Sequence, residues 1–272
     1  MSGDIKGARS GPEENRLQGH WLLAKMGKQV LRPGGLEMTT TLLKHAELKP
    51  TQTVVEFGPG VGKTASLLLQ TPPNSYVGVD PNTEGTSEVS QVIKNYPHVA
   101  SRLVAAEAKD TGLEDGVADM VMGEAMLTMM SPADKIATMR EAARLLKPGG
   151  KYVIHEMGLT PDDIAPEVAG QLQKEISRTI KVGARPLTMP EWQQLLTEAG
   201  LAVEFTYTNS MSLLEPRRLL ADEGLVGVLR IVKNMITNPA GRKRMLAMRA
   251  IFNEYADNLC AVGIIATKPL AE

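Results

Sequence analysis

The residues best suited to chemistry are a glutamate, three alternating glycines and an aspartate in the first third of the chain. Residues 54–62 read VVEFGPGVG, and Asp80 follows 18 residues after the last of these glycines. Glycines allow the backbone to approach a bound molecule closely, and a carboxylate at the end of the next strand can accept hydrogen bonds from both hydroxyl groups of a ribose. This spacing predicts a site for a nucleotide-type cofactor.

Three patterns of glycine spacing compete for this segment. A dinucleotide fingerprint requires its third glycine at position 63, where the chain has Lys63. A phosphate-binding loop would end in Gly62-Lys63-Thr64, but Phe57 stands in place of its first glycine, and the loop is one residue short. The third pattern, an acid followed by glycines at alternate positions, is satisfied by Glu56, Gly58, Gly60 and Gly62.

The third pattern resembles motif I of the class I S-adenosylmethionine-dependent methyltransferases. Three further segments resemble parts of the same superfamily in the same order: residues 32–36 (RPGGL), 118–125 (ADMVMGEA) and 146–150 (LKPGG). The resemblance runs from about residue 30 to residue 268 and is greatest to small-molecule enzymes of the ubiquinone/menaquinone-biosynthesis type. A phosphate-loop nucleotide-binding enzyme remains the less favoured alternative.

The resemblance implies S-adenosylmethionine as the cofactor and S-adenosylhomocysteine as its product. It implies that Glu56 faces the ammonium group of the cofactor and that Asp80 binds the ribose. Gly34 and Gly35 would close over the cofactor carboxylate, with the positive charge supplied by Arg32 or Lys28. The cofactor-binding candidates are Gly35, Glu56, Gly58, Pro59, Gly60, Asp80, Pro81, Glu107, Ala108, Gly123 and Glu124.

Methyl transfer from a sulfonium is an in-line displacement, so the enzyme must mainly align the acceptor with the methyl group and exclude water. A base is needed only if the acceptor must lose a proton. The catalytic candidates are His155 at the end of a strand, Glu124 at the end of the preceding strand, and His20 in the N-terminal helix. Because side chains alternate along a strand, only one of His155 and Glu156 can face the acceptor.

Short apolar strands alternate with helices through the middle of the chain. We expect strands over 53–57, 75–80, 101–105, 118–123 and 151–156, with helices over 62–70, 84–95 and 132–146 between them. This alternation predicts an α/β, Rossmann-like, seven-stranded and mostly parallel sheet with helices on both faces. Ligands bind such sheets at the carboxyl ends of the strands, where Glu56, Asp80, Glu107, Glu124 and Glu156 all fall.

The flanking segments complete the predicted architecture. We expect a tail over 1–12, helices over 13–31 and 36–47, a helix over 162–182, and final strands over 201–207 and 261–267. Between those strands we expect helices over 215–222, 223–237 and 239–257, which form a cap over the acceptor pocket or a dimer surface. The predicted domains are 1–35, a cofactor-binding domain of 36–208 plus 259–272, and a helical insertion of 209–258.

Composition narrows the class further. The chain has 272 residues, of which 43% are hydrophobic, a net charge of −1 and a single cysteine, Cys260. A net charge this close to zero gives no reason to expect that the protein binds nucleic acid or an anionic membrane. A single cysteine excludes an internal disulfide and a zinc site built from cysteines. No apolar run approaches the roughly 18 residues of a membrane span, so we expect a cytoplasmic protein without a metal.

Two functions follow from this reading. The first is methyl transfer to a small, partly apolar acceptor. The second is a non-catalytic protein that binds S-adenosylmethionine and forms a homodimer through the inserted helices.

Overall fold

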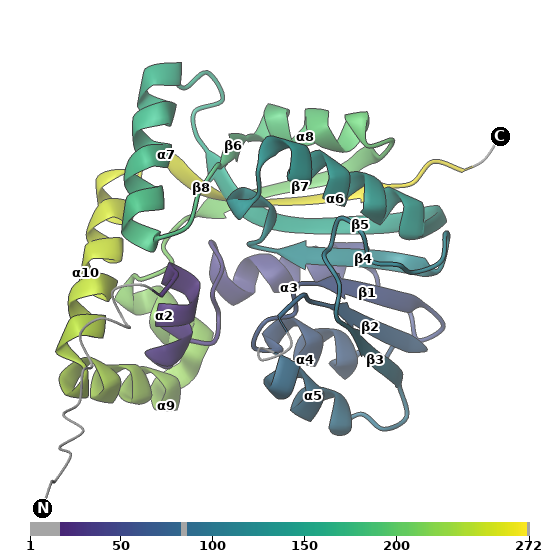
Figure 1. The fold of residues 1–272 in the computed structure, drawn as a ribbon, viewed down its shortest axis with the longest axis horizontal. Coiled ribbons are helices and arrows are strands. Elements are labelled where there is room, and N and C mark those ends of the chain that lie inside the picture. The colour runs from purple at the N-terminus through teal and green to yellow at the C-terminus, as the bar shows by residue number, and fades with distance from the viewer. Residues whose placement is uncertain (1–16, 83–85, 271–272) are drawn as a thin grey trace, which may run out of the picture.

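The computed structural model describes residues 17–82 and 86–270, which build one twisted sheet between two layers of helices (Figure 1). Five parallel strands come first: β1 (Thr53–Phe57), β2 (Ser75–Val79), β3 (Ala100–Val104), β4 (Ala118–Glu124) and β5 (Leu146–Leu159). Two antiparallel strands, β7 (Ala202–Ser210) and β8 (Leu259–Thr267), complete the order β3-β2-β1-β4-β5-β8-β7. The predicted fold class is confirmed, and a two-residue strand, β6 (Leu187–Thr188), adds to it by pairing with β5.

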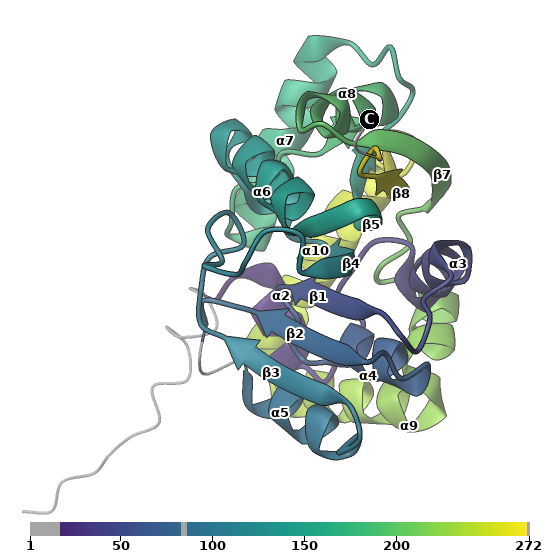
Figure 2. The same cartoon turned by 90° about the vertical axis from the view of Figure 1, so that its right-hand side faces the viewer.

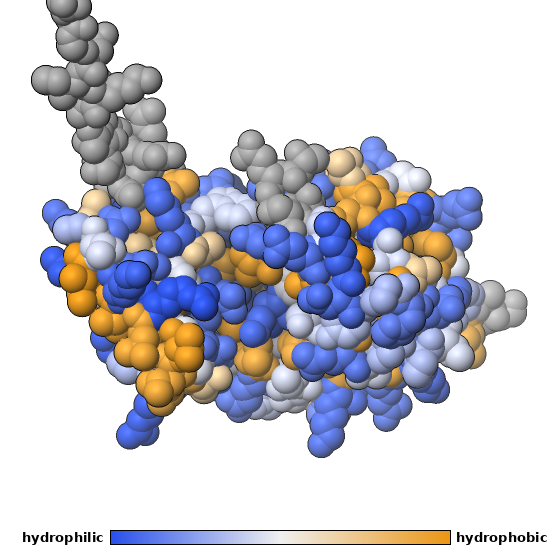
Figure 3. Space-filling model, turned by 90° about the horizontal axis from the view of Figure 1, so that it is seen from below, coloured by the Kyte–Doolittle hydropathy of each residue, from blue (hydrophilic) through white to orange (hydrophobic). Residues whose placement is uncertain are grey.

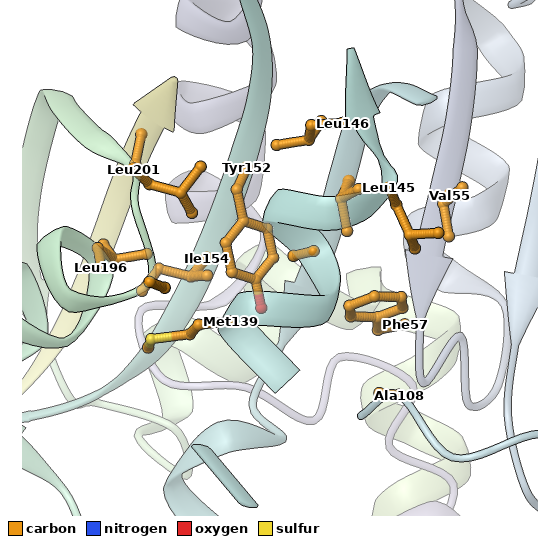
Figure 4. Packing of buried hydrophobic residues seen from close by; sticks show 14 of the residues in the cluster. Val55, Phe57, Ala108, Met139, Leu145, Leu146, Tyr152, Ile154, Leu196 and Leu201 are labelled. Atoms are coloured by element: carbon orange, nitrogen blue, oxygen red, sulfur yellow. The ribbon is translucent and has the colours of Figure 1, made fainter. Parts of the chain in front are cut away.

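Each face of the sheet is covered by its own helices because the buried strands are apolar on both sides. On one face α3 (Gly35–Ala46), α4 (Lys63–Gln70) and α5 (Thr86–Lys94) pack into one apolar cluster. On the other face α6 (Pro132–Leu145) and α8 (Met189–Glu198) pack into a second. Figure 4 shows Tyr152 of β5 in the middle of that second cluster, between Phe57 of β1 and Leu196 of α8.

A third apolar cluster lies beyond the carboxyl ends of the parallel strands and joins segments from both ends of the chain. It packs α2 (Gly19–Lys25) against α7 (Pro166–Ile180), α9 (Pro216–Thr237) and α10 (Pro239–Glu254), as Figures 1 and 2 show. We call these four helices the cap. The predicted insertion therefore supplies α9 and α10 to a larger helical layer that also includes the N-terminal helix. No helix in the described part of the chain is long and apolar enough to cross a bilayer.

Some helix boundaries differ from the sequence prediction. The N-terminal helix, expected over 13–31, is only α2, and residues 13–16 and the tail lie outside the described residues. It ends because Gly27 takes a left-handed conformation (φ 95°) against the side chain of Arg230 in α9. The break expected between residues 222 and 223 is present one residue later, where Gly224 (φ 65°, ψ 176°) interrupts α9.

Two glycines in cap helices should respond in opposite ways to the same substitution. Gly224 has a backbone conformation that is almost restricted to glycine, so Gly224→Ala should lower the free energy of unfolding by about 1–3 kcal/mol. Gly170 lies inside α7 with open space around its missing Cβ, so Gly170→Ala should raise that free energy by up to about 1 kcal/mol. Urea unfolding of both variants measures these changes. A change of the same sign in the free energy of unfolding of both variants would contradict the non-helical backbone at Gly224.

Candidate active site

The glycine-rich loop after β1 adopts a backbone conformation that requires glycine. Gly58, Gly60 and Gly62 have φ angles of 61°, 50° and 75°. A Cβ at Gly58 or Gly60 would have no protein atom closer than 3.8 Å, whereas one at Gly62 would lie 3.2 Å from Val92 of α5. The first two glycines therefore border open space, and the third allows the loop to pack on a helix.

That open space is a polar hollow at the carboxyl ends of β1 and β4. Five of the predicted cofactor-binding residues line it: Glu56, Gly58, Pro59, Gly60 and Glu124. The lining also includes residues that the sequence analysis did not predict: Gln29, Leu31, Val61, Lys63, Thr64, Met122 and Ala125. Arg32, expected to supply positive charge, also lines the hollow. We call this hollow the cofactor cleft.

Glu56 forms a buried acidic wall of the cofactor cleft. Its side chain accepts a hydrogen bond of 2.6 Å from the hydroxyl group of Tyr76 in β2. Burial raises the pKa of Glu56 to about 8, although the bond from Tyr76 opposes this shift. Near neutral pH the carboxyl group is therefore held mainly in its uncharged form, and a nearby cation would favour its ionisation.

Asp80 follows β2 and ties two loops together. Its carboxylate accepts a hydrogen bond of 2.8 Å from the backbone N–H of Asn82, and the backbone of Gly60 is a second donor. Burial raises the pKa of Asp80, and these two backbone donors counteract that effect. The side chain is half-buried and contacts the glycine-rich loop through Gly60, but it does not belong to the lining of the cofactor cleft.

Glu124, at the end of β4, joins four separate segments through its carboxylate. It forms an ion pair of 3.2 Å with Arg32 and accepts hydrogen bonds from Thr39 of α3 at 2.6 Å and from Thr64 of α4. His155 of β5 lies 2.9 Å away through Nδ1. Burial alone would raise the pKa of Glu124, but Arg32, His155 and Thr39 outweigh it and lower the pKa to about 2.

His155 is fully buried, and both of its ring nitrogens have partners. Nδ1 contacts the Glu124 carboxylate, and Nε2 contacts the carbonyl oxygen of Pro33. Both ring nitrogens are therefore occupied by contacts within the protein. His155 is absent from the linings of the cofactor cleft and of the apolar pocket described below, and it serves here to hold the 32–33 segment against the sheet.

Glu156 faces the opposite side of β5 from His155, as alternation requires. Its carboxylate accepts backbone hydrogen bonds of 2.8–3.0 Å from Met126, Leu127 and Thr128, and one of 2.7 Å from the Thr128 hydroxyl group. It thereby fixes the turn after β4 and the short 3-10 helix η1 (Leu127–Met129). Among the described residues, neither His155 nor Glu156 belongs to the lining of the cofactor cleft or of the apolar pocket described below, so alternation alone did not show which side chain would face an acceptor.

A second, apolar pocket lies beneath the cap. It is lined by α2 through Gly19, His20 and Leu23, by α10 through Met248 and Phe252, and by η1 and β5 through residues such as Met129 and Met157. His20 is the only histidine in this lining; its ring has no hydrogen-bond partner among the described residues and contacts the ring of Trp21 (5.1 Å between centroids). Burial lowers the pKa of His20, which favours the neutral imidazole.

The cofactor cleft and the apolar pocket adjoin each other. Leu31 and Ala125 line both of them. Ala125 has a left-handed backbone (φ 52°), unusual for a residue with a Cβ, and its N–H donates to the carbonyl oxygen of His155 at 2.7 Å. A strained backbone at the boundary between two pockets is typical of functional sites.

The remaining predicted residues lie elsewhere. Gly35 packs on Asp222 of α9, whose carboxylate would be 2.4 Å from an added Cβ. Lys28 is buried and pairs with Glu223 at 3.3 Å and with Asp222 at 3.7 Å, so its charge holds the cap. Four others are outside the two pocket linings: Pro81 and Glu107 are exposed, Ala108 is in the core, and Gly123 packs near Met126. Their roles in cofactor binding stay predictions.

Comparison with known proteins identifies a domain within the chain. A family model described as a methyltransferase domain matches residues 55–154, which include the glycine-rich loop, Asp80 and Glu124. The chain carries a methyltransferase domain. This confirms the class I methyltransferase family indicated by the motifs, while the ubiquinone/menaquinone subtype stays a prediction.

One sequence relative and two solved structures are similar to this methyltransferase. An uncharacterized protein of Haemophilus influenzae is 29% identical over 92% of this chain and 98% of its own length. The solved [4+2]-cyclase SpnF has a TM-score of 0.70 at 15% identity, with 96% of each chain covered. Phosphoethanolamine N-methyltransferase 2 of Haemonchus contortus, solved with phosphomonomethylethanolamine and S-adenosylhomocysteine, has a TM-score of 0.68 at 16% identity, covering 96% of this chain and 59% of that one.

The Glu124 cluster should stabilise the methyltransferase in a pH-dependent way. Glu124→Gln leaves Arg32 and His155 without their carboxylate, so it should lower the free energy of unfolding at pH 7 by about 3 kcal/mol or more. The pKa of Glu124 is lowered by folding, so its stabilisation is present above pH 4.5 and is lost as the pH falls toward 2. The difference from wild type, measured by urea unfolding, should therefore shrink in acid.

Glu204→Gln is the matched control, because Glu204 is exposed on β7 and should change stability by no more than about 0.5 kcal/mol. An equal effect of the two substitutions would show that the contacts of Glu124 with Arg32 and His155 do not add to the free energy of unfolding.

Proposed function

We propose that this methyltransferase transfers the methyl group of S-adenosylmethionine directly to a small, largely apolar acceptor held beneath the cap. The observation that supports this proposal is that the two pockets share a boundary, formed by Leu31 and Ala125. A polar cleft on one side suits the cofactor, and an apolar pocket on the other suits the acceptor. An in-line displacement needs the two ligands to meet end to end, as adjoining pockets allow.

The residues of the cofactor cleft fit S-adenosylmethionine. Nη2 of Arg32 is buried without a hydrogen-bond partner in the described residues, although Nε and Nη1 bind Thr39 and Glu124. A carboxylate of the cofactor would satisfy this nitrogen. Glu56 in the cleft lining would offer a carboxylate to the ammonium group, and Asp80, which contacts the glycine-rich loop, would accept hydrogen bonds from the ribose hydroxyl groups. When bound, the cofactor supplies an activated methyl group on a sulfonium.

The acceptor side requires little chemistry from the protein. Leu23, Met248 and Phe252 enclose the pocket with apolar surface and exclude water from it. His20 is the titratable group in that lining, and its neutral form could accept a proton from an acceptor hydroxyl or amine. Of the three catalytic candidates, we therefore favour His20 as the base. Glu124 is tied to Arg32, and His155 has both nitrogens occupied.

Cofactor binding should depend on Asp80 and hardly on Lys63. Asp80→Ala removes a charged hydrogen-bond acceptor and should weaken S-adenosylmethionine binding by about 10- to 100-fold. Asp80→Asn keeps an acceptor for the Asn82 N–H, so comparison of the two variants separates loop capping from ribose binding. Lys63→Ala should change the Kd by no more than about threefold, because S-adenosylmethionine has no phosphate for its ammonium group to bind.

Calorimetric titration with S-adenosylmethionine, S-adenosylhomocysteine and ATP-magnesium measures these effects. Binding of ATP-magnesium alone, with loss of that binding in Lys63→Ala, would overturn the proposal in favour of a phosphate-loop enzyme.

His20 should affect turnover and not cofactor affinity. With an apolar hydroxyl- or amine-bearing acceptor found by screening for S-adenosylhomocysteine release, His20→Gln should lower kcat/KM by about 100-fold or more. Because burial lowers the pKa of His20, the acid limb of the wild-type profile should lie below pH 6.5 and disappear in the variant. His98→Gln, an exposed histidine, is the control. An unchanged kcat/KM in His20→Gln would remove His20 from the mechanism.

A further inference from the structure

We propose that the outer face of α9 and α10 docks on an anionic lipid surface. The exposed apolar residues of the molecule concentrate there. Leu225, Leu229, Val232 and Ile236 are 67%, 60%, 45% and 69% exposed. At 3.6 residues per turn their spacing places them within an arc of about 60° on α9. Figure 3 shows this stripe as an orange patch at the lower left, bordered by blue side chains.

The stripe is additional to the side of α9 that packs in the cap. Ile231 is 1% exposed and belongs to the cap cluster, and Gly227 is buried on the same side. The inward side of α9 thus makes the apolar contacts with the rest of the cap, yet the outward side of the same helix is also apolar. A contiguous exposed apolar patch of this kind marks a contact with another molecule or a membrane.

The charge around the stripe is one-sided. Residues 216–254 contain eight lysines and arginines and three acids, a balance of +5, whereas the whole chain has a net charge of −1. Of the exposed charged residues on α9 and α10, five are basic and one, Glu254, is acidic. The basic ones are Arg217, Arg230, Lys233, Arg242 and Lys243. The near-neutral charge of the chain therefore conceals a strongly basic surface.

The fold itself produces this asymmetry by turning two acids inward. Asp222 accepts a hydrogen bond of 2.9 Å from the Leu36 N–H. Glu223 accepts bonds from the N–H groups of Gln29 and Val30 at 2.9–3.1 Å, and both acids pair with buried Lys28. The acids of α9 thus hold the N-terminal segment, whereas Arg217, Arg230 and Lys233 of the same helix stay exposed.

An apolar stripe flanked by lysine and arginine matches the chemistry of an anionic bilayer. Apolar side chains enter the boundary between headgroups and acyl chains, and the basic groups lie near the phosphates. A second copy of this chain fits less well, because a two-fold contact would place the same basic surface on both sides. The docking is peripheral, since no helix in the described residues can cross the bilayer.

The test is co-sedimentation of the full chain with vesicles. We compare phosphatidylcholine alone with equal parts of phosphatidylcholine and phosphatidylglycerol. The wild type should bind the anionic vesicles preferentially, and binding should weaken as salt increases. Lys233→Gln combined with Arg242→Gln should lower the partition coefficient by about fivefold for each charge removed. Leu229→Ser combined with Ile236→Ser should lower it at least as much.

The control variants carry the same kinds of substitution at exposed positions outside α9 and α10. Lys44→Gln with Lys174→Gln removes two exposed lysines outside α9 and α10, and Leu270→Ser removes an apolar side chain that is 75% exposed. All variants should retain the wild-type melting temperature and S-adenosylmethionine affinity. Absence of binding to anionic vesicles, or equal losses in the controls, would overturn the proposal. So would a dimer by light scattering that only the stripe variant dissociates, which would identify the stripe as a homodimer contact.

Discussion

The structure depends on one buried carboxylate, that of Glu124. A carboxylate can stay ionised away from water only if cations and hydrogen-bond donors surround it. Arg32, Thr39, Thr64 and His155 meet that requirement, and each comes from a different segment. Because all of these partners meet one carboxylate, the N-terminal segment, α3, the start of α4 and β5 are fixed relative to β4. The cofactor cleft is the space left between the segments that this carboxylate gathers.

A second buried ionic group extends this arrangement to the cap. Lys28 pairs with Asp222 and Glu223, which also accept backbone hydrogen bonds from the segment between α2 and α3. That segment is therefore attached to β4 through Glu124 and to α9 through Asp222 and Glu223. Leu31 and Pro33 of that segment line the apolar pocket, so the shape of the pocket depends on contacts between residues nearly 200 positions apart in the chain. This coupling explains how an insertion far from the glycine-rich loop can shape the apolar pocket.

Local patterns allowed much of the fold to be predicted, because strand and helix periodicity and the glycine spacing are properties of short segments. The sheet, the loop and the position of the α9 break agree with those patterns. The partners of His155 and Lys28 could not be predicted, since Pro33 and Asp222 meet them only after the chain has folded. Thr64 is a missed lining residue that had a signal, because it lies in the first turn of the helix after the glycines. His20 was identified as a candidate from its helix, but its place in an apolar pocket depends on α10, which no local pattern relates to α2.

Because its pKa is raised, Glu56 carries a proton in the cleft near neutral pH. The acid can lie beneath the glycine-rich loop without a counterion because it is mainly protonated near neutral pH. A cationic ammonium group placed beside it would shift that equilibrium and release the proton to the solvent. Binding and deprotonation then become one thermodynamic event, and the calorimetric heat includes the ionisation enthalpy of the buffer. The cleft would exchange one positive charge for another, so its net charge would change little between its free and bound states.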